Sequence, residues 1–261
     1  MNRGQTAPGR TGRISILLAM AVLVAILLPG SASADTSSSG EPAEAGAAVS
    51  APSRAQGATV ARIVTPVLAR TSLTRPHGGH RLQAQTSWSG QAQYLLVLAG
   101  AVQRDREWVK VLLPSRPNGS AGWVPRDKVV LDHTPYWVQV STGSRQVTVF
   151  REGRRIRGFR AVVGAPATPT PHGLGAIYER DPQPDPHGFV GPWVLALTLL
   201  SDKLHHFEGG EGRVGIHGRD GASLLDPLGS ARSHGCIRIA NAAVRWMAAH
   251  VPAGTPVRVT G

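Results

Sequence analysis

The chain has 261 residues, including 20 prolines and 31 glycines, and 28 Lys and Arg against 16 Asp and Glu give it a formal charge of +12. This length suits one or two compact domains, and the scattered prolines and glycines exclude a collagen-like repeat. No basic run or nucleic-acid motif accompanies the charge, which argues against a DNA- or RNA-binding protein and leaves an anionic surface or polymer as the partner class.

The first 34 residues have the pattern of a signal peptide. Arg3, Arg10 and Arg13 precede an almost purely apolar run over 14–28, and a small-x-small cleavage sequence follows at 32–34. The apolar run is shorter than the about 20 residues that a membrane-spanning helix usually needs. We therefore expect export and cleavage after residue 34, with an uncleaved membrane anchor as the alternative.

Residues 35–57 are rich in Ser, Ala, Gly, Pro and Glu and contain no aromatic residue, so we expect a disordered linker. Over 58–132, short apolar stretches alternate with turn residues, which predicts a small β-module. Residues 108–111 and 122–124 resemble those of bacterial SH3-like wall-associated modules, which implies a small β-barrel. The alternative is an unrelated β-domain whose tryptophans belong to its core. The expected strands are Thr59–Val64, Tyr94–Leu98, Trp108–Leu113 and Trp123–Val130.

A second domain is expected over 135–261, because partly alternating β-branched runs begin there. One helix is expected near the end of the chain, with apolar residues at 244, 247, 248 and 251, a cap at Asn241 and a stop at Pro252. The sequence therefore predicts a mainly β chain with one helix near its C-terminus. The expected strands of this domain are Tyr136–Val140, Val147–Arg151, Phe159–Val163, Val194–Leu200 and, closing the sheet, Val257–Val259.

Cys236 is the only cysteine of the chain and cannot form an internal disulfide. In an exported protein such a thiol is buried and inert, paired with another chain, or reactive. A reactive thiol needs a nearby base that helps to form the thiolate, and donors that hold the oxyanion formed when it attacks a carbonyl. His217 and the turn around Gly235 can supply these groups, because a glycine lets the backbone approach a substrate closely.

Cys236 lies in the sequence Ser-His-Gly-Cys-Ile-Arg over 233–238, and His217 and Gly218 lie upstream. Together with Val-Gly at 163–164 and Thr-Pro-Thr-Pro-His-Gly at 168–173, these residues resemble the signature of the YkuD-type L,D-transpeptidase domain. The resemblance covers about Pro135–Thr260 and implies a β-sandwich-like catalytic domain rather than a papain fold.

The resemblance implies a role for each matching residue of the catalytic group. Cys236 would be the nucleophile and His217 the general base, with the carbonyl of Gly218 orienting the imidazole. The amides of Gly235 and Cys236 would line the oxyanion hole, with His234 beside it. The expected catalytic residues are Cys236, His217, His234 and Gly235.

The expected substrate-binding residues are Arg238, Ser233 and Gly218. Arg238 would face the anionic substrate peptide, and Ser233 would brace the turn at the thiol. Many family members have a serine where this chain has Gly218, so no side chain is assigned as a third member of the triad. The proline-rich segment 180–193 is either a lid over the cleft or a loop that covers the sheet edge.

For the whole chain, the resemblance implies an exported monomeric enzyme that forms 3→3 cross-links between peptidoglycan stem peptides, without a cofactor or metal. Anionic wall polymer is a further expected partner. Attack by water instead of an amine would make it an L,D-carboxypeptidase, and a protein acceptor is a third choice. Two other classes stay open: a zinc-dependent wall hydrolase with His217, His234 and Cys236 as ligands, and a non-catalytic wall-binding module.

Overall fold

The computed structural model describes residues 49–75, 78–207 and 209–261, and these fall in one compact unit, Glu44–Gly261. The expected signal peptide and most of the expected linker lie outside the described residues. The described residues form 17 strands, two short 3-10 helices and one α-helix, which confirms the mainly β prediction. Within them, no helix is both long and apolar enough to cross a membrane.

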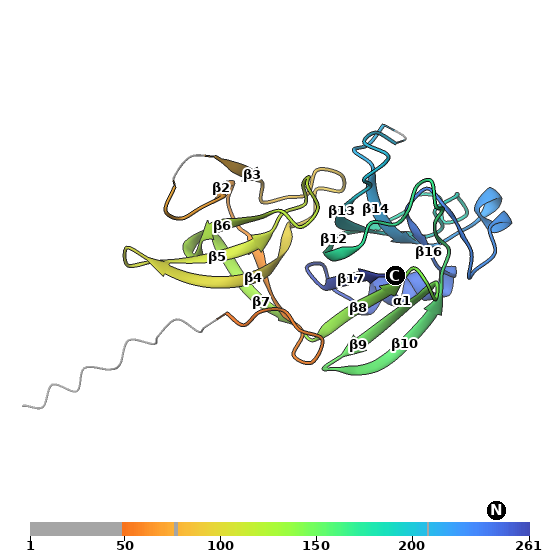
Figure 1. Cartoon of the computed structure of the whole chain (residues 1–261), viewed down its shortest axis with the longest axis horizontal. Helices are drawn as coiled ribbons and strands as arrows, with labels where there is room; N and C mark the ends of the chain where they lie inside the picture. The colour runs from red at the N-terminus through yellow and green to blue at the C-terminus, as the bar shows by residue number, and fades with distance from the viewer. Residues whose placement is uncertain (1–48, 76–77, 208) are drawn as a thin grey trace, which may run out of the picture. The chain divides into compact units, whose positions relative to one another are not determined.

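Strands β1 to β7 form the first sheet, in the order β3-β2-β6-β5-β4-β1-β7 (Figure 1). The single strand expected over Trp123–Val130 is wrong, because the 3-10 helix Arg126–Lys128 divides it into two strands. The SH3-like character and the boundaries 58–132 and 135–261 stay predictions. The bounds are β1 Ala58–Ile63, β2 Val67–Arg70, β3 Gly79–Leu82, β4 Tyr94–Gln103, β5 Arg106–Leu112, β6 Ala121–Pro125 and β7 Val129–Thr134.

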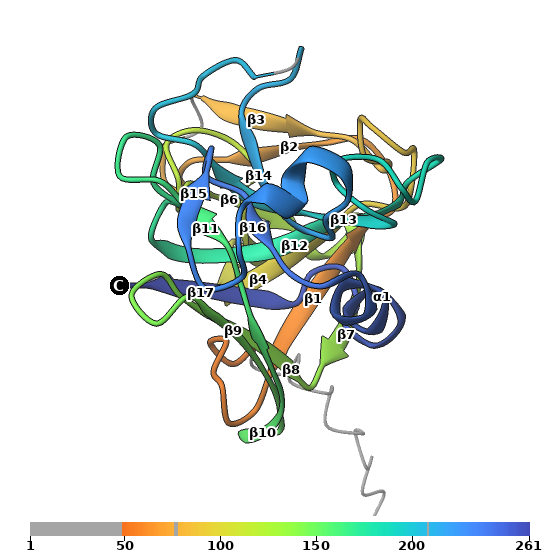
Figure 2. The same ribbon diagram turned by 90° about the vertical axis from the view of Figure 1, so that its right-hand side faces the viewer.

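The second sheet has eight strands in the order β10-β9-β8-β17-β12-β13-β14-β16. β11 and β15 pair separately, in parallel, and run side by side in Figure 2. The bounds are β8 Tyr136–Ser141, β9 Gln146–Arg151, β10 Arg154–Arg160, β11 Val163–Gly164, β12 Gly173–Pro182, β13 Trp193–Leu200, β14 Arg213–His217, β15 Ala231–Ser233, β16 Ile237–Arg238 and β17 Pro256–Thr260.

Two expectations for this sheet need correction. The run Phe159–Val163 is not one strand, because β10 ends at Arg160 and Val163 begins β11, which pairs with β15 instead. The strand over Val257–Val259 exists but does not close the sheet. It lies between β8, to which it is parallel, and β12, to which it is antiparallel, so both of its edges are hydrogen-bonded.

The helix α1 covers Asn241–His250, and its apolar side chains join the core of the second sheet. Val244 and Met247 are fully buried there, as the helical spacing predicts. The expected cap is wrong: Ala240 holds the cap position, and no side chain caps the first turn. The Asn241 side chain instead accepts a hydrogen bond of 2.8 Å from the amide of Arg219, so a residue expected to end a helix ties down the loop after β14.

Candidate active site

Strand register brings His217 and Cys236 together. β14 and β16 are parallel neighbours with Ile216 beside Ile237 and His217 beside Arg238, so Cys236, just before β16, is level with Gly215. Side chains alternate between the two faces of a strand, and Ile216 and Ile237 are fully buried in the core. The residues next to these isoleucines in sequence therefore face away from the core. Three of them, His217, Cys236 and Arg238, line one pocket.

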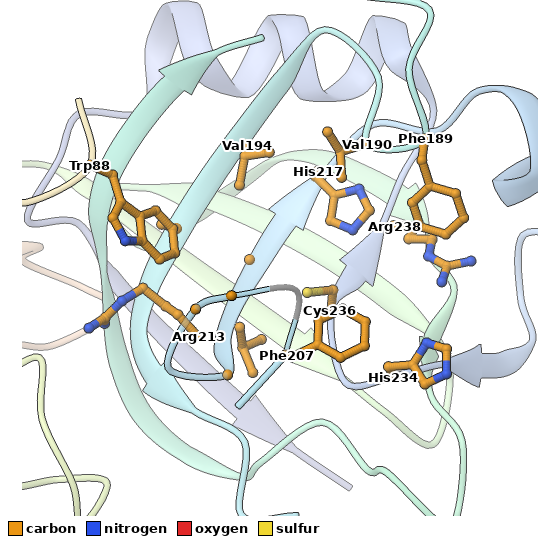
Figure 3. A pocket seen from close by; sticks show the side chains of 16 residues that line it. Trp88, Phe189, Val190, Val194, Phe207, Arg213, His217, His234, Cys236 and Arg238 are labelled. Carbon is orange, nitrogen blue, oxygen red and sulfur yellow. The ribbon is translucent and has the colours of Figure 1, made fainter. Parts of the chain in front are cut away.

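The pocket has a volume of about 610 Å³. Figure 3 shows the Cys236 thiol and the His217 imidazole in its middle, with Trp88 and Arg213 at one end and Phe189 and Arg238 at the other. A volume of this size lies in the usual range for small-molecule sites. The segment 180–193, left open as a lid or an edge cover, contributes Phe189 and Val190 to the lining.

His217 is buried at the end of β14, with 3% of its surface exposed. Its Nδ1 is 2.7 Å from the carbonyl oxygen of Gly218, where the resemblance placed an orienting group. The pKa of His217 is lowered from 6.5 to about 4, chiefly by burial and also by the charge of Arg238, while backbone hydrogen bonds to Gly218 and Val190 oppose the shift. At neutral pH the imidazole is therefore uncharged; with Nδ1–H donating to Gly218, its Nε2 is an acceptor.

The turn that presents the thiol is held by Ser233. The Ser233 hydroxyl donates to the carbonyl of Cys236 at 2.6 Å and accepts from the amide of Gly235 at 3.1 Å. Gly235 has φ +120°, a conformation that residues with a Cβ rarely adopt. The hydrogen bond to Ser233 occupies the Gly235 amide, so its expected place in an oxyanion hole does not fit this structure; the Cys236 amide stays the predicted donor.

Two threonines of the 168–173 segment support the same turn from outside. Thr170 donates to the carbonyl of Gly235 at 2.9 Å, and its oxygen accepts from the amide of Gly164 at 2.9 Å. Thr168 donates to the carbonyl of Ser233 at 3.2 Å. The threonines of the Thr-Pro-Thr-Pro motif therefore fix the backbone around Cys236. Each proline restricts the backbone conformation of the threonine before it.

Gly218 occupies a place with no room for a side chain. A Cβ there would lie 2.4 Å from Oδ1 of Asn241 and 2.9 Å from Cδ of Pro192. The first residue of α1 and the end of the loop before β13 thus approach the backbone directly behind His217. This crowding accounts for glycine where many family members have serine.

Arg238 is buried, with 3% of its surface exposed, and forms an ion pair of 2.6 Å with Asp226. Its guanidinium lies 4.8 Å from the centre of the Phe189 ring. Arg238 does line the pocket, but the Asp226 carboxylate already balances its charge. Its expected contact with the substrate stays a prediction, now with an acidic partner that the sequence reasoning did not assign.

His234 differs from His217 in its surroundings. It is exposed, lines the pocket and packs against Phe207, with ring centres 5.4 Å apart. Across the described part of the chain, no three His, Cys, Asp or Glu side chains are grouped closely enough to hold a metal ion. The geometry therefore supplies no ligand set for the zinc alternative with His217, His234 and Cys236.

Sequence reasoning missed Asp226, Asn241 and the pocket-lining aromatics Trp88, Phe189 and Phe207. One signal could have found Asp226. Arg238 lies between two isoleucines in a short strand, a position typical of a buried residue. A buried arginine is rarely found without an acidic side chain that balances its charge. The loop 219–232 contains only two acids, Asp220 and Asp226.

Comparison with known proteins places this site in a family. The family model for the YkuD L,D-transpeptidase catalytic domain matches residues 135–259. The protein named L,D-transpeptidase YkuD in Bacillus licheniformis is 32% identical over 158 residues, which cover 58% of this chain and 86% of that protein. The protein of the same name in Bacillus subtilis is 31% identical over 154 residues, which cover 57% of this chain and 84% of that protein.

Among solved structures, an L,D-transpeptidase from Mycobacterium tuberculosis matches with a TM-score of 0.42 and 14% identity, over 77% of this chain and 95% of that one. The residues that the family model matches include the Cys236 turn, the His217 strand and the threonine segment. On this sequence match, the chain belongs to the YkuD family of L,D-transpeptidase catalytic domains.

Proposed function

We propose that this protein is an exported cysteine L,D-transpeptidase that forms 3→3 cross-links in peptidoglycan through a thioester on Cys236. One observation carries the proposal. A buried, uncharged imidazole, tied at Nδ1 to the Gly218 carbonyl, lines the same pocket as the chain's single thiol from the neighbouring strand. Nucleophilic acyl transfer by cysteine uses a thiol with a base of this kind nearby.

In the acylation step, the Cys236 sulfur attacks the carbonyl of the third residue of a tetrapeptide stem while His217 takes the thiol proton at Nε2. The carbonyl oxygen becomes an oxyanion, which we expect the Cys236 amide to receive. The bond to the terminal D-alanine then breaks, and the imidazolium returns the proton to the leaving amine. The products are a thioester and free D-alanine, so atoms and charge balance.

In the second step, the side-chain amine of another stem attacks the thioester. The amine loses a proton to His217, the new amide bond forms, and the sulfur leaves and is reprotonated. With water as the acceptor the same steps release a tripeptide, which is the carboxypeptidase alternative.

The low pKa of His217 sets the resting state of the pair. A neutral imidazole beside a thiol can accept a proton at any pH above its pKa of about 4. Attack and proton transfer are therefore expected to be coupled, rather than to start from a stable thiolate–imidazolium pair.

The test is to incubate the purified protein with disaccharide-tetrapeptides and to analyse the products by mass spectrometry. A 3→3 linked dimer with release of D-alanine supports the proposal, and a tripeptide monomer as the only product would show the carboxypeptidase. Cys236→Ala should abolish both products while the melting temperature stays close to that of the wild type. Product formation by Cys236→Ala above a trace would rule out the thioester route.

The two histidines are separated by acylation rate against pH. His217→Ala should slow acylation by about 10²–10⁴-fold, the usual worth of a positioned acid–base group. His234→Ala should cost less and keep the shape of the wild-type profile, because His234 is exposed and packs on Phe207. Loss of the titration in His234→Ala alone would reverse the two assignments.

A further inference from the structure

One end of the pocket is built by a residue from the other sheet. Trp88 lies in the loop between β3 and β4, yet it lines the pocket together with Cys236 and His217. Figure 3 shows its indole above Arg213, at the end opposite Phe189 and Arg238. Trp88 is half exposed, so its ring is available to a ligand rather than consumed in a core.

A buried carboxylate holds this loop in place. Glu179 of β12 is 1% exposed, and its Oε1 accepts from the Thr86 hydroxyl at 2.7 Å and the Ser89 amide at 2.7 Å. The Ser89 hydroxyl donates to the same oxygen. These donors stand on either side of Trp88, so one carboxylate fixes the two ends of the short segment that carries the indole.

Holding the loop in this way is costly, which argues for a purpose beyond stability. Burying a carboxylate is expensive unless it is fully hydrogen-bonded. The second oxygen of Glu179, Oε2, has no hydrogen-bond partner among the described residues. An apolar pair would join the same surfaces at lower cost, whereas three donors converging on one oxygen define a single geometry for the loop.

Arg213 supports the indole from below. It is the first residue of β14, the strand that ends at His217, and its guanidinium lies 5.9 Å from the Trp88 ring centre. The guanidinium is already occupied, because it donates to the carbonyls of Leu197 at 2.8 Å and Pro114 at 3.0 Å and is ion-paired with Glu211. Arg213 therefore acts as a support and not as an anion site.

The chemistry of this end differs from that of the other. The lining between Trp88 and Cys236 includes the small apolar residues Ala196 and Gly215, which are paired neighbours on β13 and β14. The imidazoles and Arg238 lie toward the thiol and beyond it. An indole face over a shallow apolar floor suits an uncharged ligand surface, such as the methyl and methylene groups of a peptide.

We propose that Trp88 forms a subsite for the uncharged aliphatic part of the stem peptide, and that Glu179 is the residue that positions Trp88. The first sheet then completes the active site instead of serving only as a separate module. This inference rests on the proposed function, since the ligand is the stem peptide whose carbonyl reacts with Cys236.

The experiment measures acylation of the purified protein by a tetrapeptide stem and by the disaccharide-tetrapeptide. Trp88→Ala should raise KM about tenfold for both donors with little change in kcat, the size of a lost aromatic contact. Trp88→Phe should recover most of the loss. Leu68→Ala, an equally exposed apolar side chain of the first sheet outside the pocket, is the matched control and should change nothing.

The role of Glu179 is tested through its partner Thr86, because removing the carboxylate itself risks misfolding. Thr86→Val deletes one donor and should raise KM about threefold, a modest hydrogen-bond loss. In a Trp88→Ala background the same change should have no further effect, since a positioning residue acts only through the residue it positions. Additive effects of the two changes would overturn the positioning role.

Three results would overturn the subsite. A Trp88→Ala enzyme within twofold of the wild type on both donors would show that the indole touches no substrate. An effect on the disaccharide donor alone would show that a sugar, not the peptide, binds there. An equal loss in the rate of Cys236 alkylation by iodoacetamide would show that the change damages the nucleophile. Failure of the proposed function itself looks different, because the wild type would then form no acyl-enzyme with either donor.

Discussion

Arg238 and Asp226 form an ion pair at the wall of the pocket, with 2.6 Å between Nη1 and Oδ2. Arg238 is adjacent to His217 in the paired strands and lowers the pKa of its imidazole. The carboxylate of Asp226, twelve residues before its partner in the sequence, thus controls how much positive charge the catalytic pair experiences.

Asp226→Asn should therefore destabilise the protein. It leaves the guanidinium of Arg238 buried without a counterion, which costs about 3 kcal/mol, at the low end for a broken buried pair because Asp226 is partly exposed. Thermal or urea unfolding measures the loss. Asp220→Asn removes a similarly exposed carboxylate of the same loop, whose ion-pair partner His187 is exposed rather than buried. It is the control and should change stability by less than about 0.5 kcal/mol, because asparagine also caps the first turn of a helix. Equal stability of the two variants would show that the pair contributes nothing.

Gly218→Ser should lower both stability and activity. Its Cβ would stand 2.4 Å from Oδ1 of Asn241, so either the backbone behind His217 or the Asn241 side chain that accepts from the Arg219 amide must move, at a cost of about 1–3 kcal/mol for overpacking. Melting temperature and the rate of Cys236 acylation are the measurements. Removing the obstructing amide with Asn241→Ala should restore part of the loss in the double variant. A Gly218→Ser protein as stable as the wild type would contradict the crowding.

The low pKa of His217 predicts a pH dependence of stability. Its pKa is about 4 in the folded protein and 6.5 for an ordinary solvated histidine, so the unfolded chain binds the proton more readily between these values. Stability is therefore complete above pH 6.5 and falls as the pH drops toward 4, by about 3 kcal/mol in total from this group. His217→Asn should remove this part of the slope. Urea unfolding of both proteins from pH 7 to pH 4 measures the difference. If the free energy of unfolding changes with pH equally in both proteins, the pKa of His217 is not lowered by folding.

A carbapenem should acylate Cys236. Its strained lactam offers a carbonyl to the same sulfur. When the ring opens, the amine stays attached to the acyl group, so no leaving group departs from the adduct. Intact-mass measurement should give one adduct per chain. Cys236→Ser, which keeps the size of the side chain but replaces the thiol, should react far more slowly. An adduct that forms on Cys236→Ser at the wild-type rate would locate the reaction elsewhere.

Much of the fold can be predicted from local sequence patterns, and the predictions that were wrong failed for physical reasons. The strand over Val194–Leu200 and the helix with apolar residues at 244, 247 and 248 were predictable, because periodicity records which side of an element is buried. Phe159–Val163 was predicted as one strand because nothing local marks the change of sheet after Arg160. Asn241 was predicted as a cap from residue type alone, whereas a distant amide, that of Arg219, uses its oxygen.

The sequence by itself determined the family, because the motif over 233–238 and the upstream His217 and Gly218 are short patterns that residue order alone reveals. Only the tertiary structure decided what surrounds these residues. Strand register places Arg238 beside His217, a hydroxyl occupies the Gly235 amide, and Glu179 holds Trp88 at the pocket from the other sheet. Such partners are 2 to 93 residues apart in the chain, and nothing in residue order fixes which of them the folded backbone brings within hydrogen-bond distance.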